Sequence, residues 1–298
     1  LSRIHHMRRW DETLVAPRKE LVLARSDHDG DLADEVILEG PAMNLYLSPK
    51  RGGSAIELDL RQAKHHLTGV LARRREAYHV DVARARVVSD EELGNISAHD
   101  LVRATEEGLA DKLVVDGHPR GAFVDHLLAA DVTPQAFDRD YASVVDLPHQ
   151  AYAITGLGDA HVELCCSVDG LRLVKRIAMD AKGVEARYEI TSATPRQVTF
   201  ACELDFTLLS PDAVGGRRVV VDDGPALAPG EAGEDSNVRA VQVACDDMGV
   251  DVVLESDRAA ELWRIPIETV SQSERGFERA YQGTALVLAW RVELTKAP

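Results

Sequence analysis

The stretch RGGSAIELDL, residues 51–60, carries the clearest fold signal in the chain. Its apolar side chains Ile56, Leu58 and Leu60 alternate with acidic ones, so in an extended chain they fall on one face. Two glycines stand directly before this run, where a tight turn or a close backbone approach needs residues without a Cβ. The stretch therefore predicts a turn followed by a half-buried β-strand.

Further strands and tight turns follow along the rest of the chain. Asp169-Gly170 is a strong two-residue hairpin signal between the apolar stretches 162–168 and 171–177. A second hairpin is predicted around Asp247. The strand-helix-strand rhythm of parallel sheets is missing from the sequence. The pattern therefore predicts an all-β fold, a large antiparallel β-sandwich.

Four segments depart from this pattern. A short N-terminal helix is predicted at Leu1–Val15, where apolar residues recur at helical spacing, and one small helical insertion at Ser97–Leu109. Val80–Val88 is expected to add a short strand. Gly224–Asn237 is rich in glycine, proline, alanine and acidic residues, which indicates a solvated loop.

The composition limits the classes of function. Lys and Arg number 34 against 50 Asp and Glu, which gives a net charge of -16 over 298 residues. Such an acidic surface repels phosphate groups, so neither nucleic acid nor a membrane is expected as a partner. No apolar run reaches the roughly 20 residues that cross a bilayer, and the N-terminus lacks the apolar core of a signal peptide. The four cysteines form no C-x-x-C pair, so we expect them to be reduced, in a cytoplasmic protein.

An acidic loop, SDHDGDLADE at residues 26–35, is the candidate metal site. Carboxylates at alternate positions around a glycine can converge on one hard cation, and calcium takes about six to eight oxygen ligands. The spacing is not that of an EF-hand. The candidate calcium ligands are Asp27, Asp29, Asp31, Asp34 and Glu35. The alternative is a solvated acidic turn without a metal, and no cofactor is otherwise required.

Polar residues also gather in RRREAYH, residues 73–79. The cluster could form a site, but we favour a structural ion-pair cluster with Tyr78 partly buried, since such networks perturb pKa values as readily as sites do. The stretch GHPRGAFVDHLL, residues 117–128, offers a second group of histidines and charged residues. Its Asp125 and His126 are adjacent and would face opposite sides of a strand, which argues against a local Asp–His pair.

Carboxylates recur near the C-terminus, in Pro266–Gly283. Glu268, Glu274 and Glu278 could in principle supply the acid and base for cleavage of a sugar bond. A hydrogen-bonded loop between strands is the favoured interpretation. The sequence contains no G-x-S-x-G, H-E-x-x-H or phosphate-loop motif.

Six motifs occur in an order that resembles a known family. Together they are similar to the C-terminal β-sandwich domain of the 4-alpha-glucanotransferase and alpha-amylase group of glycoside hydrolase family 57, from Ala24 to Leu294. In chain order the motifs are DHDGDLADEVILE (27–39), GGSAIELDL (52–60), RRREAYH (73–79), RGAFVDHLL (120–128), FACELDFTLL (200–209) and PIETVSQSERGFERAYQG (266–283).

The resemblance implies a galactose mutarotase-like supersandwich and a non-catalytic role. In the family a glutamate nucleophile and an aspartate acid/base lie in an N-terminal barrel, and neither can be assigned to a residue of this sequence. We therefore expect a domain that packs against and supports the N-terminal catalytic barrel of the same protein, an alpha-amylase or 4-alpha-glucanotransferase. Residues 1–20 would be the helical tail of the preceding region and residues 21–298 the β-sandwich domain. Weak binding of alpha-glucan is a second role that such a domain can have.

Two other functions remain open on the residues alone. Supersandwich folds also host sugar epimerases and lyases, which would need a cleft that gathers His79, His118, His126 and a glutamate. The third alternative is a carbohydrate-binding module. An aromatic content of only 5% counts against it, because few rings are left to stack on sugar.

Overall fold

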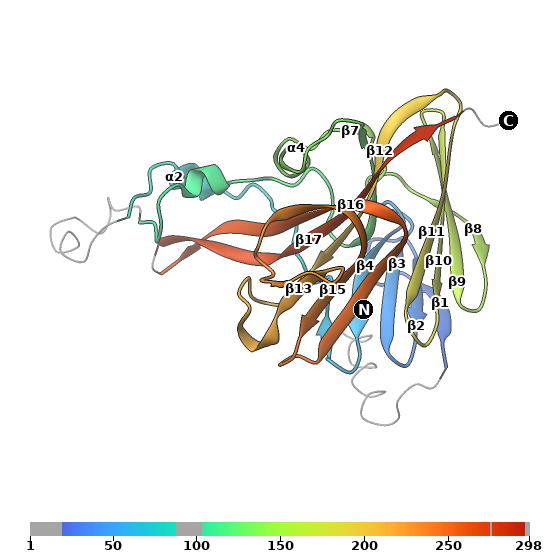
Figure 1. Cartoon of the computed structure of the whole chain (residues 1–298), viewed down its shortest axis with the longest axis horizontal. Coiled ribbons are helices and arrows are strands. Elements are labelled where there is room, and N and C mark those ends of the chain that lie inside the picture. Colours follow the sequence, from blue (N-terminus) through green and yellow to red (C-terminus); the bar gives the residue numbers. More distant parts are fainter. Residues whose placement is uncertain (1–19, 88–102, 275, 296–298) are drawn as a thin grey trace.

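The structure is a computed structural model that describes residues 20–87, 103–274 and 276–295. The helix predicted at Leu1–Val15 lies outside these residues, so the predicted domain boundary after residue 20 stays a prediction. The described chain forms two antiparallel β-sheets that share one apolar core (Figure 1). The all-β antiparallel sandwich is therefore confirmed. Within the described residues, no helix has the length and apolar character needed to span a bilayer.

The large sheet has 13 strands and the small sheet has four. The strands of the large sheet are β1 (Val22–Ser26), β2 (Glu35–Glu39), β3 (Met43–Ser48), β4 (Ser54–Leu60), β5 (His65–His66), β6 (Ala122–Ala129), β7 (Ser143–Val145), β12 (Arg196–Phe206), β13 (Arg218–Val221), β14 (Ala226–Leu227), β15 (Gly233–Cys245), β16 (Val250–Ser273) and β17 (Gly276–Leu294). The strands of the small sheet are β8 (Ala153–Leu157), β9 (His161–Val168), β10 (Leu171–Met179) and β11 (Val184–Ser192). Short helical turns are α2 (His79–Val82), η1 (Leu109–Lys112), α4 (Pro134–Arg139) and η2 (Val214–Gly216).

The order of strands across the large sheet is β1-β2-β3-β4-β6-β12-β17-β16-β15-β13-β14, with β5 on β4 and β7 on β6. The small sheet has the order β11-β10-β9-β8. Local turns account for much of this order, because neighbouring strands are often consecutive in the chain. The predicted Asp169-Gly170 hairpin joins β9 to β10, with φ of 50° and 73° at its two central residues, and is confirmed. The second predicted hairpin, between β15 and β16, is also confirmed.

Strand β12 lies at the centre of the large sheet, between β6 and β17, and is buried on both faces. Its alternation places Phe200, Cys202 and Leu204 in the core between the sheets. Glu203 and Asp205 belong to the other face and are fully buried there. A strand with two acidic residues on a buried face must supply them with ionic partners.

A buried lysine joins the two sheets in addition to the apolar packing. Lys175 of β10 donates hydrogen bonds to the carbonyls of Gly52 at 3.2 Å, Gly53 at 3.1 Å and Phe123 at 2.8 Å. Its Nζ also lies 2.7 Å from Oδ2 of Asp125 on β6. The two glycines have φ of 66° and 56°, a conformation that favours glycine, so the predicted glycine turn is confirmed.

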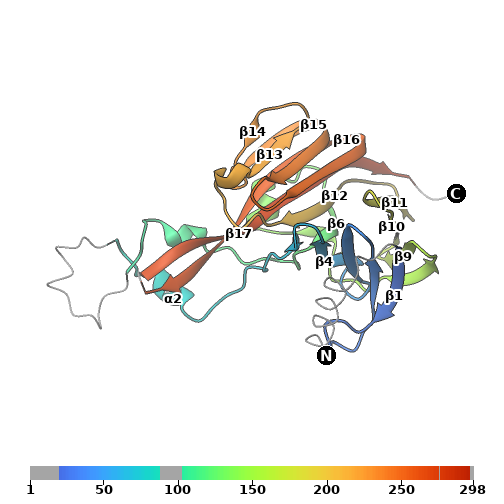
Figure 2. The same cartoon turned by 90° about the horizontal axis from the view of Figure 1, so that it is seen from below.

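The last two strands extend beyond the sheet as a long ribbon (Figures 1 and 2). The pairing of β15 with β16 ends at Arg264, and from Pro266 onward the pairing partner of β16 is β17. Because proline has no N–H, it is tolerated where a strand has a partner on one side only. We call residues 267–283 of this ribbon, together with segments 71–87 and 103–116 that cover it, the arm. A two-stranded ribbon is marginal alone, and the arm has its own small apolar cluster of Val82, Ala104, Leu109, Val270 and Phe277.

Two of the predicted segments in the arm are wrong or lie partly outside the described residues. Val80–Val88 was expected to be a strand, but in its described part, residues 80–87, the chain forms the end of α2 and a turn. Local hydrogen bonds, such as Asp81 N–H to Tyr78 O at 3.0 Å, use the backbone groups that a strand would pair. The helical insertion expected at Ser97–Leu109 is described only from residue 103, and there isolated bridges to neighbouring segments replace a helix.

Two predicted loops are instead largely strand. Gly224–Asn237 contains β14 and the start of β15, because Gly233–Asp235 pair with Leu262–Arg264 of β16. Pro266–Gly283 was expected to be an inter-strand loop, and it forms most of the paired ribbon of the arm. In the first case the partner strand lies in a separate stretch, so the local composition did not indicate it. In the second case the stretch folds back on itself as a hairpin, with Ser273 opposite Gly276.

Candidate functional site

The acidic loop between β1 and β2 is held by hydrogen bonds to its own carboxylates. Asp27 accepts the backbone N–H groups of Gly30 at 2.8 Å and Leu32 at 3.2 Å. Glu35 is fully buried at the start of β2 and accepts the Ser48 hydroxyl at 3.2 Å. Part of the acidity of the loop is therefore used to form the turn itself.

Basic side chains from neighbouring segments neutralise other carboxylates of the loop. Arg51 lies 2.9 Å from Oδ2 of Asp29 and 3.2 Å from Oδ2 of Asp31, and Arg25 lies 3.2 Å from Asp34. Three of the five candidate ligands each offer an oxygen within 4.8 Å of the others: Asp27, Asp29 and Glu35. The structure does not add Asp31 or Asp34 to this group. A calcium ion in the loop stays a prediction.

Two histidines and a glutamate meet in the buried centre of the large sheet. Nε2 of His118 and Nε2 of His126 lie 2.7 Å and 2.8 Å from Oε2 of Glu203. Arg120 forms an ion pair with the same carboxylate. The ring of Phe137 from α4 packs against His126 with centroids 5.0 Å apart. None of the three clustered residues is more than 5% exposed, so the cluster is closed to solvent.

Burial sets the protonation of this cluster. It lowers the pKa of His126 to about 4, so the ring is neutral at pH 7. The ring Nε2–H then donates to Glu203, and Nδ1 accepts the Tyr141 hydroxyl at 3.0 Å. Burial alone would raise the pKa of Glu203, but His118 and Arg120 outweigh it and hold that pKa well below its ordinary value. The guanidinium of Arg120 thus supplies the positive charge that an ionised buried glutamate needs.

The histidine cluster does not form the cleft that a sugar epimerase would need. His118 and His126 do converge on a glutamate, but they are buried, and His79 lies in the arm instead. Asp125 faces Lys175 while His126 faces Glu203, so the prediction that these neighbours point to opposite sides is confirmed.

An ionic chain connects this cluster to the arm. Asp116 lies 2.5 Å from Nη2 of Arg120 and 2.6 Å from Nη2 of Arg73, and Arg73 lies 2.7 Å from Asp138 of α4. Burial alone would raise the pKa of Asp116, but the two arginines hold it below its ordinary value. The first residue of RRREAYH is therefore a structural ion-pair partner, as predicted, and it anchors the segment that follows.

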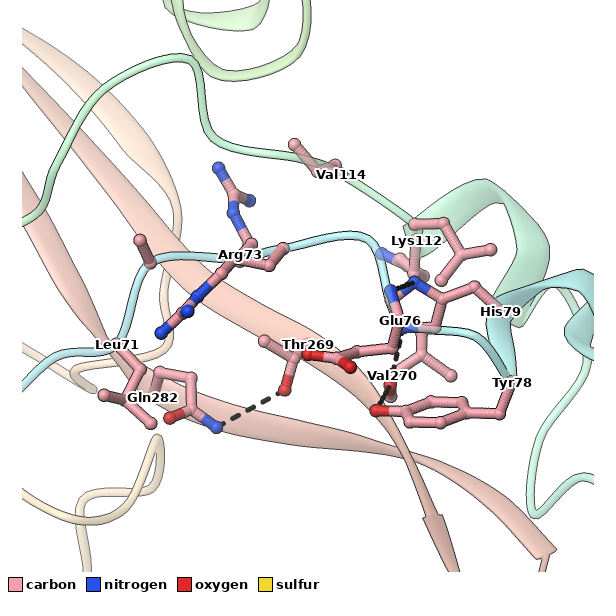
Figure 3. Close-up of a pocket in the computed structure, with 13 residues that line it drawn as sticks. Leu71, Arg73, Glu76, Tyr78, His79, Lys112, Val114, Thr269, Val270 and Gln282 are labelled. Carbon is pink, nitrogen blue, oxygen red and sulfur yellow. Dashed lines mark hydrogen bonds between the residues drawn. The ribbon is translucent and has the colours of Figure 1, made fainter.

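A pocket of 310 Å³ lies where that segment crosses the ribbon (Figure 3). We call it the arm pocket. Residues 71–74, 76, 78 and 79 form one wall, residues 112–114 another, and Thr269, Val270 and Gln282 of the ribbon form the base. Its lining includes residues from two of the recognised motifs, 73–79 and 266–283.

Hydrogen bonds fix the side chains at the base of the arm pocket. Nδ1 of His79 accepts the N–H of Glu76 at 3.1 Å, so its Nε2 carries the proton and donates to the carbonyl of Val270 at 3.3 Å. The Tyr78 hydroxyl donates to the same carbonyl at 3.3 Å. Both ring nitrogens of His79 are thus occupied, and the ring positions the wall and is not available as a base.

The three glutamates proposed for acid–base chemistry do not meet in the pocket. Glu268 pairs with Arg279 at 3.1 Å, and Glu278 stands opposite Ser271 on the ribbon. Glu274 lies beyond the last residue of β16. None of them is among the residues that line the arm pocket.

Sequence reasoning missed the acidic partners of the buried histidines and arginines. Glu203 and Asp205 stand at alternate positions in FACELDF, residues 200–206, an otherwise apolar strand. Two carboxylates inside an apolar run were the available signal, because such a strand is stable only if cations lie opposite. The identity of those cations was not readable without the packing.

Comparisons with known proteins agree with the motif order. The family described as "Alpha-amylase/4-alpha-glucanotransferase, C-terminal" matches residues 27–297. "Alpha-amylase 1" of Dictyoglomus thermophilum is 33% identical over 276 residues, which cover 90% of this chain and 39% of that protein. The "4-alpha-glucanotransferase" of Thermococcus litoralis is 25% identical over 304 residues, which cover 97% of this chain and 42% of that protein.

Structural comparison gives the same fold. The crystal structure of 4-alpha-glucanotransferase from Thermococcus litoralis superposes with a TM-score of 0.71 at 23% identity, over 92% of this chain and 40% of that chain. The chain thus spans about two fifths of the length of the curated relatives it matches. Since the family match covers most of the sequence, the chain belongs to the family of alpha-amylase and 4-alpha-glucanotransferase C-terminal domains.

Proposed function

We propose that this chain is a non-catalytic β-sandwich domain of an alpha-glucan-processing protein, and that it packs against and supports an N-terminal catalytic region of that protein. The observation that carries the proposal is the family match together with its extent. The relatives named alpha-amylase and 4-alpha-glucanotransferase are more than twice as long as the part that matches.

The pairing of the buried ionisable groups favours a structural, non-catalytic role for the domain. The buried histidines and carboxylates of the large sheet are bound to one another and to Arg120 and Arg73. Groups that are closed to solvent and paired in this way hold a fold together and cannot reach a substrate. The glutamates of the ribbon are likewise separate from one another.

The arm offers a surface for such packing. Val80 is 62% exposed and Val115 is 54% exposed, and both belong to the segments that cover the ribbon. Apolar side chains left in water on a protruding element favour burial against a partner. In the proposal, this partner is the catalytic region.

The test is to assay hydrolysis and transfer on maltoheptaose by this chain alone, and then by the chain expressed with the coding sequence upstream of Leu1. We expect no turnover by the chain alone and turnover by the longer protein. We also expect the catalytic region to melt at a lower temperature without this domain. Turnover by the isolated chain would contradict the proposal, as would mutarotation of glucose followed by polarimetry.

Two further parts of the proposal concern the setting of the domain. A cytoplasmic location is supported by the four cysteines, all of which are free thiols in the structure. Occupation of the acidic loop by calcium is supported by the convergence of Asp27, Asp29 and Glu35.

A further inference from the structure

The arm pocket is the feature that a purely supporting role leaves unexplained. Two motif stretches that are far apart in sequence, 73–79 and 266–283, meet across it. Tyr78 and Val270, which are hydrogen-bonded at its base, are 192 positions apart. A buried ion pair between Arg73 and Asp116 holds the first stretch in place beside the second.

Hydrogen bonds within the fold hold the base of the pocket. Its side chains are held by the hydrogen bonds of His79 and Tyr78 to Val270, and Nε2 of Gln282 donates to Oγ1 of Thr269 at 3.3 Å (Figure 3). A site whose walls are fixed before binding loses little conformational entropy when a ligand enters. This order distinguishes the pocket from a gap between loose loops.

The rim, by contrast, presents polar groups that are not used by the fold. Arg74, Glu76 and Lys112 are exposed, and their side chains form no hydrogen bond or ion pair with any other residue in the described ranges. Gln282 uses its amide nitrogen on Thr269, which leaves its Oε1 without a hydrogen-bond partner among the described residues. The rim therefore offers both donors and acceptors within one small opening.

These groups select a neutral ligand rich in hydroxyls. A hydroxyl can donate to a carboxylate and accept from a guanidinium or an ammonium, so it can satisfy both signs of charge at once. An anion would pair with Arg74 and Lys112 but would leave Glu76 without a partner, and an apolar ligand would leave all three without partners. The volume of 310 Å³ is near the lower limit for small-molecule sites, about 300 Å³, which suits one sugar ring.

We propose that the arm pocket binds one glucose unit of an alpha-glucan chain. Glu76 and the Oε1 of Gln282 accept hydrogen bonds from its hydroxyls, and Arg74 and Lys112 donate to them. The hydroxyl-rich ligand follows from the pocket, whereas its identity as alpha-glucan rests on the proposed function. The arm is then the part of the domain that contacts carbohydrate.

The proposal is tested by titrating the 298-residue protein with maltoheptaose, followed by calorimetry and by amide chemical shifts. We expect a dissociation constant on the order of 1 mM, typical of a single sugar unit held by a few hydrogen bonds. Cellohexaose, which has β-linkages, serves as the comparison ligand and is expected to bind at least tenfold more weakly.

Two variants locate the binding. Glu76→Gln and Gln282→Ala are each expected to weaken binding of maltoheptaose about tenfold, which equals about 1.4 kcal/mol. Glu255→Gln is the matched control, because Glu255 is an exposed glutamate on β16 outside the pocket. Since the Glu76 side chain has no partner among the described residues, its substitution leaves the fold intact, which a thermal melt of each variant checks.

Each result bears on a separate claim. Absence of heat and of shifts at about 20 mM maltoheptaose, roughly twenty times the expected dissociation constant, overturns the site. Binding that survives both pocket variants places the sugar elsewhere and also overturns it. Equal binding of cellohexaose overturns the assignment to alpha-glucan. None of these outcomes touches the supporting role, which fails only if the chain itself turns over substrate or does not affect the catalytic region.

Discussion

The substitution Lys175→Met removes the buried cation between the two sheets and keeps most of the side-chain volume. Asp125 then loses the Nζ that lies 2.7 Å from its Oδ2 and keeps the Tyr152 hydroxyl at 3.3 Å. Its Oδ1 has no hydrogen-bond partner among the described residues even before the change. Three backbone carbonyls that accept from Lys175 lose their donor as well.

The size of the effect follows from these contacts. Removal of one partner from a buried ion pair costs about 3–5 kcal/mol, because the remaining charge stays buried and unpaired. At roughly 2–4 °C per kcal/mol, Lys175→Met is expected to melt roughly 6–20 °C below the parent protein. Adding Asp125→Asn to this variant is expected to recover part of the loss, because a neutral amide needs no cation.

The loss should also depend on pH. Burial already raises the pKa of Asp125, and the loss of Lys175 raises it further. A carboxyl whose folded pKa is raised is more easily protonated in the folded state, so its contribution to stability is present at low pH and is lost as pH rises through that pKa. The deficit of Lys175→Met is therefore expected to be smaller at about pH 4 than at about pH 7.

Urea unfolding at both pH values measures the deficit. Lys182→Met is the matched control, because Lys182 is exposed in the turn after β10 and should change the free energy of unfolding by about 0.5 kcal/mol or less. A deficit under about 1 kcal/mol at neutral pH would refute the reasoning. So would a deficit that does not shrink on acidification.

Three other predictions concern a turn, a histidine and the acidic loop. Gly53→Ala is expected to lower the free energy of unfolding by about 1–3 kcal/mol, since φ is 56° and a Cβ would lie 2.9 Å from Leu164 Cδ1; Gly183→Ala, with open space, is the control in thermal melts. Because burial lowers the pKa of His126 from 6.5 to about 4, the unfolded state takes up a proton at this residue first as pH falls, so the free energy of unfolding should decrease between these pH values. His126→Gln should flatten this part of the pH profile measured by urea unfolding. An unchanged slope in the variant would contradict the assignment to His126. If the loop at 26–35 holds calcium, EDTA should lower the melting temperature and added calcium restore it, and an unchanged midpoint in both directions would argue for an acidic turn without metal.

Local signals predicted the features that depend on a few adjacent residues. The Asp169-Gly170 turn was readable because its two residues tolerate positive φ, and the glycine turn before β4 for the same reason. The opposite directions of Asp125 and His126 follow from the geometry of any strand. Such preferences belong to the backbone and do not need a partner segment.

Strand pairing and the pairing of charges were predicted less well than the turns. The ribbon of the arm was taken for a loop, because its pairing spans β16 and β17 around a proline and acidic residues that are not typical of strands. Val80–Val88 was taken for a strand, although its described residues, 80–87, lie on the arm and close local turns. In the candidate site, the sequence indicated polar clusters but not which charges pair.

By itself, the sequence determined the all-β fold, its main turns and, through the order of six motifs, the family. The tertiary structure alone decided which polar groups are paired inside the protein and which face solvent. Arg73 and Arg74 are neighbours in one motif, yet Arg73 is buried against Asp116 while Arg74 is exposed at the rim of the arm pocket. The physical reason is that a charge is stabilised by whatever lies within a few ångströms of it, and for Arg73 that neighbourhood is supplied by Asp116 and Asp138, which lie in other segments of the chain.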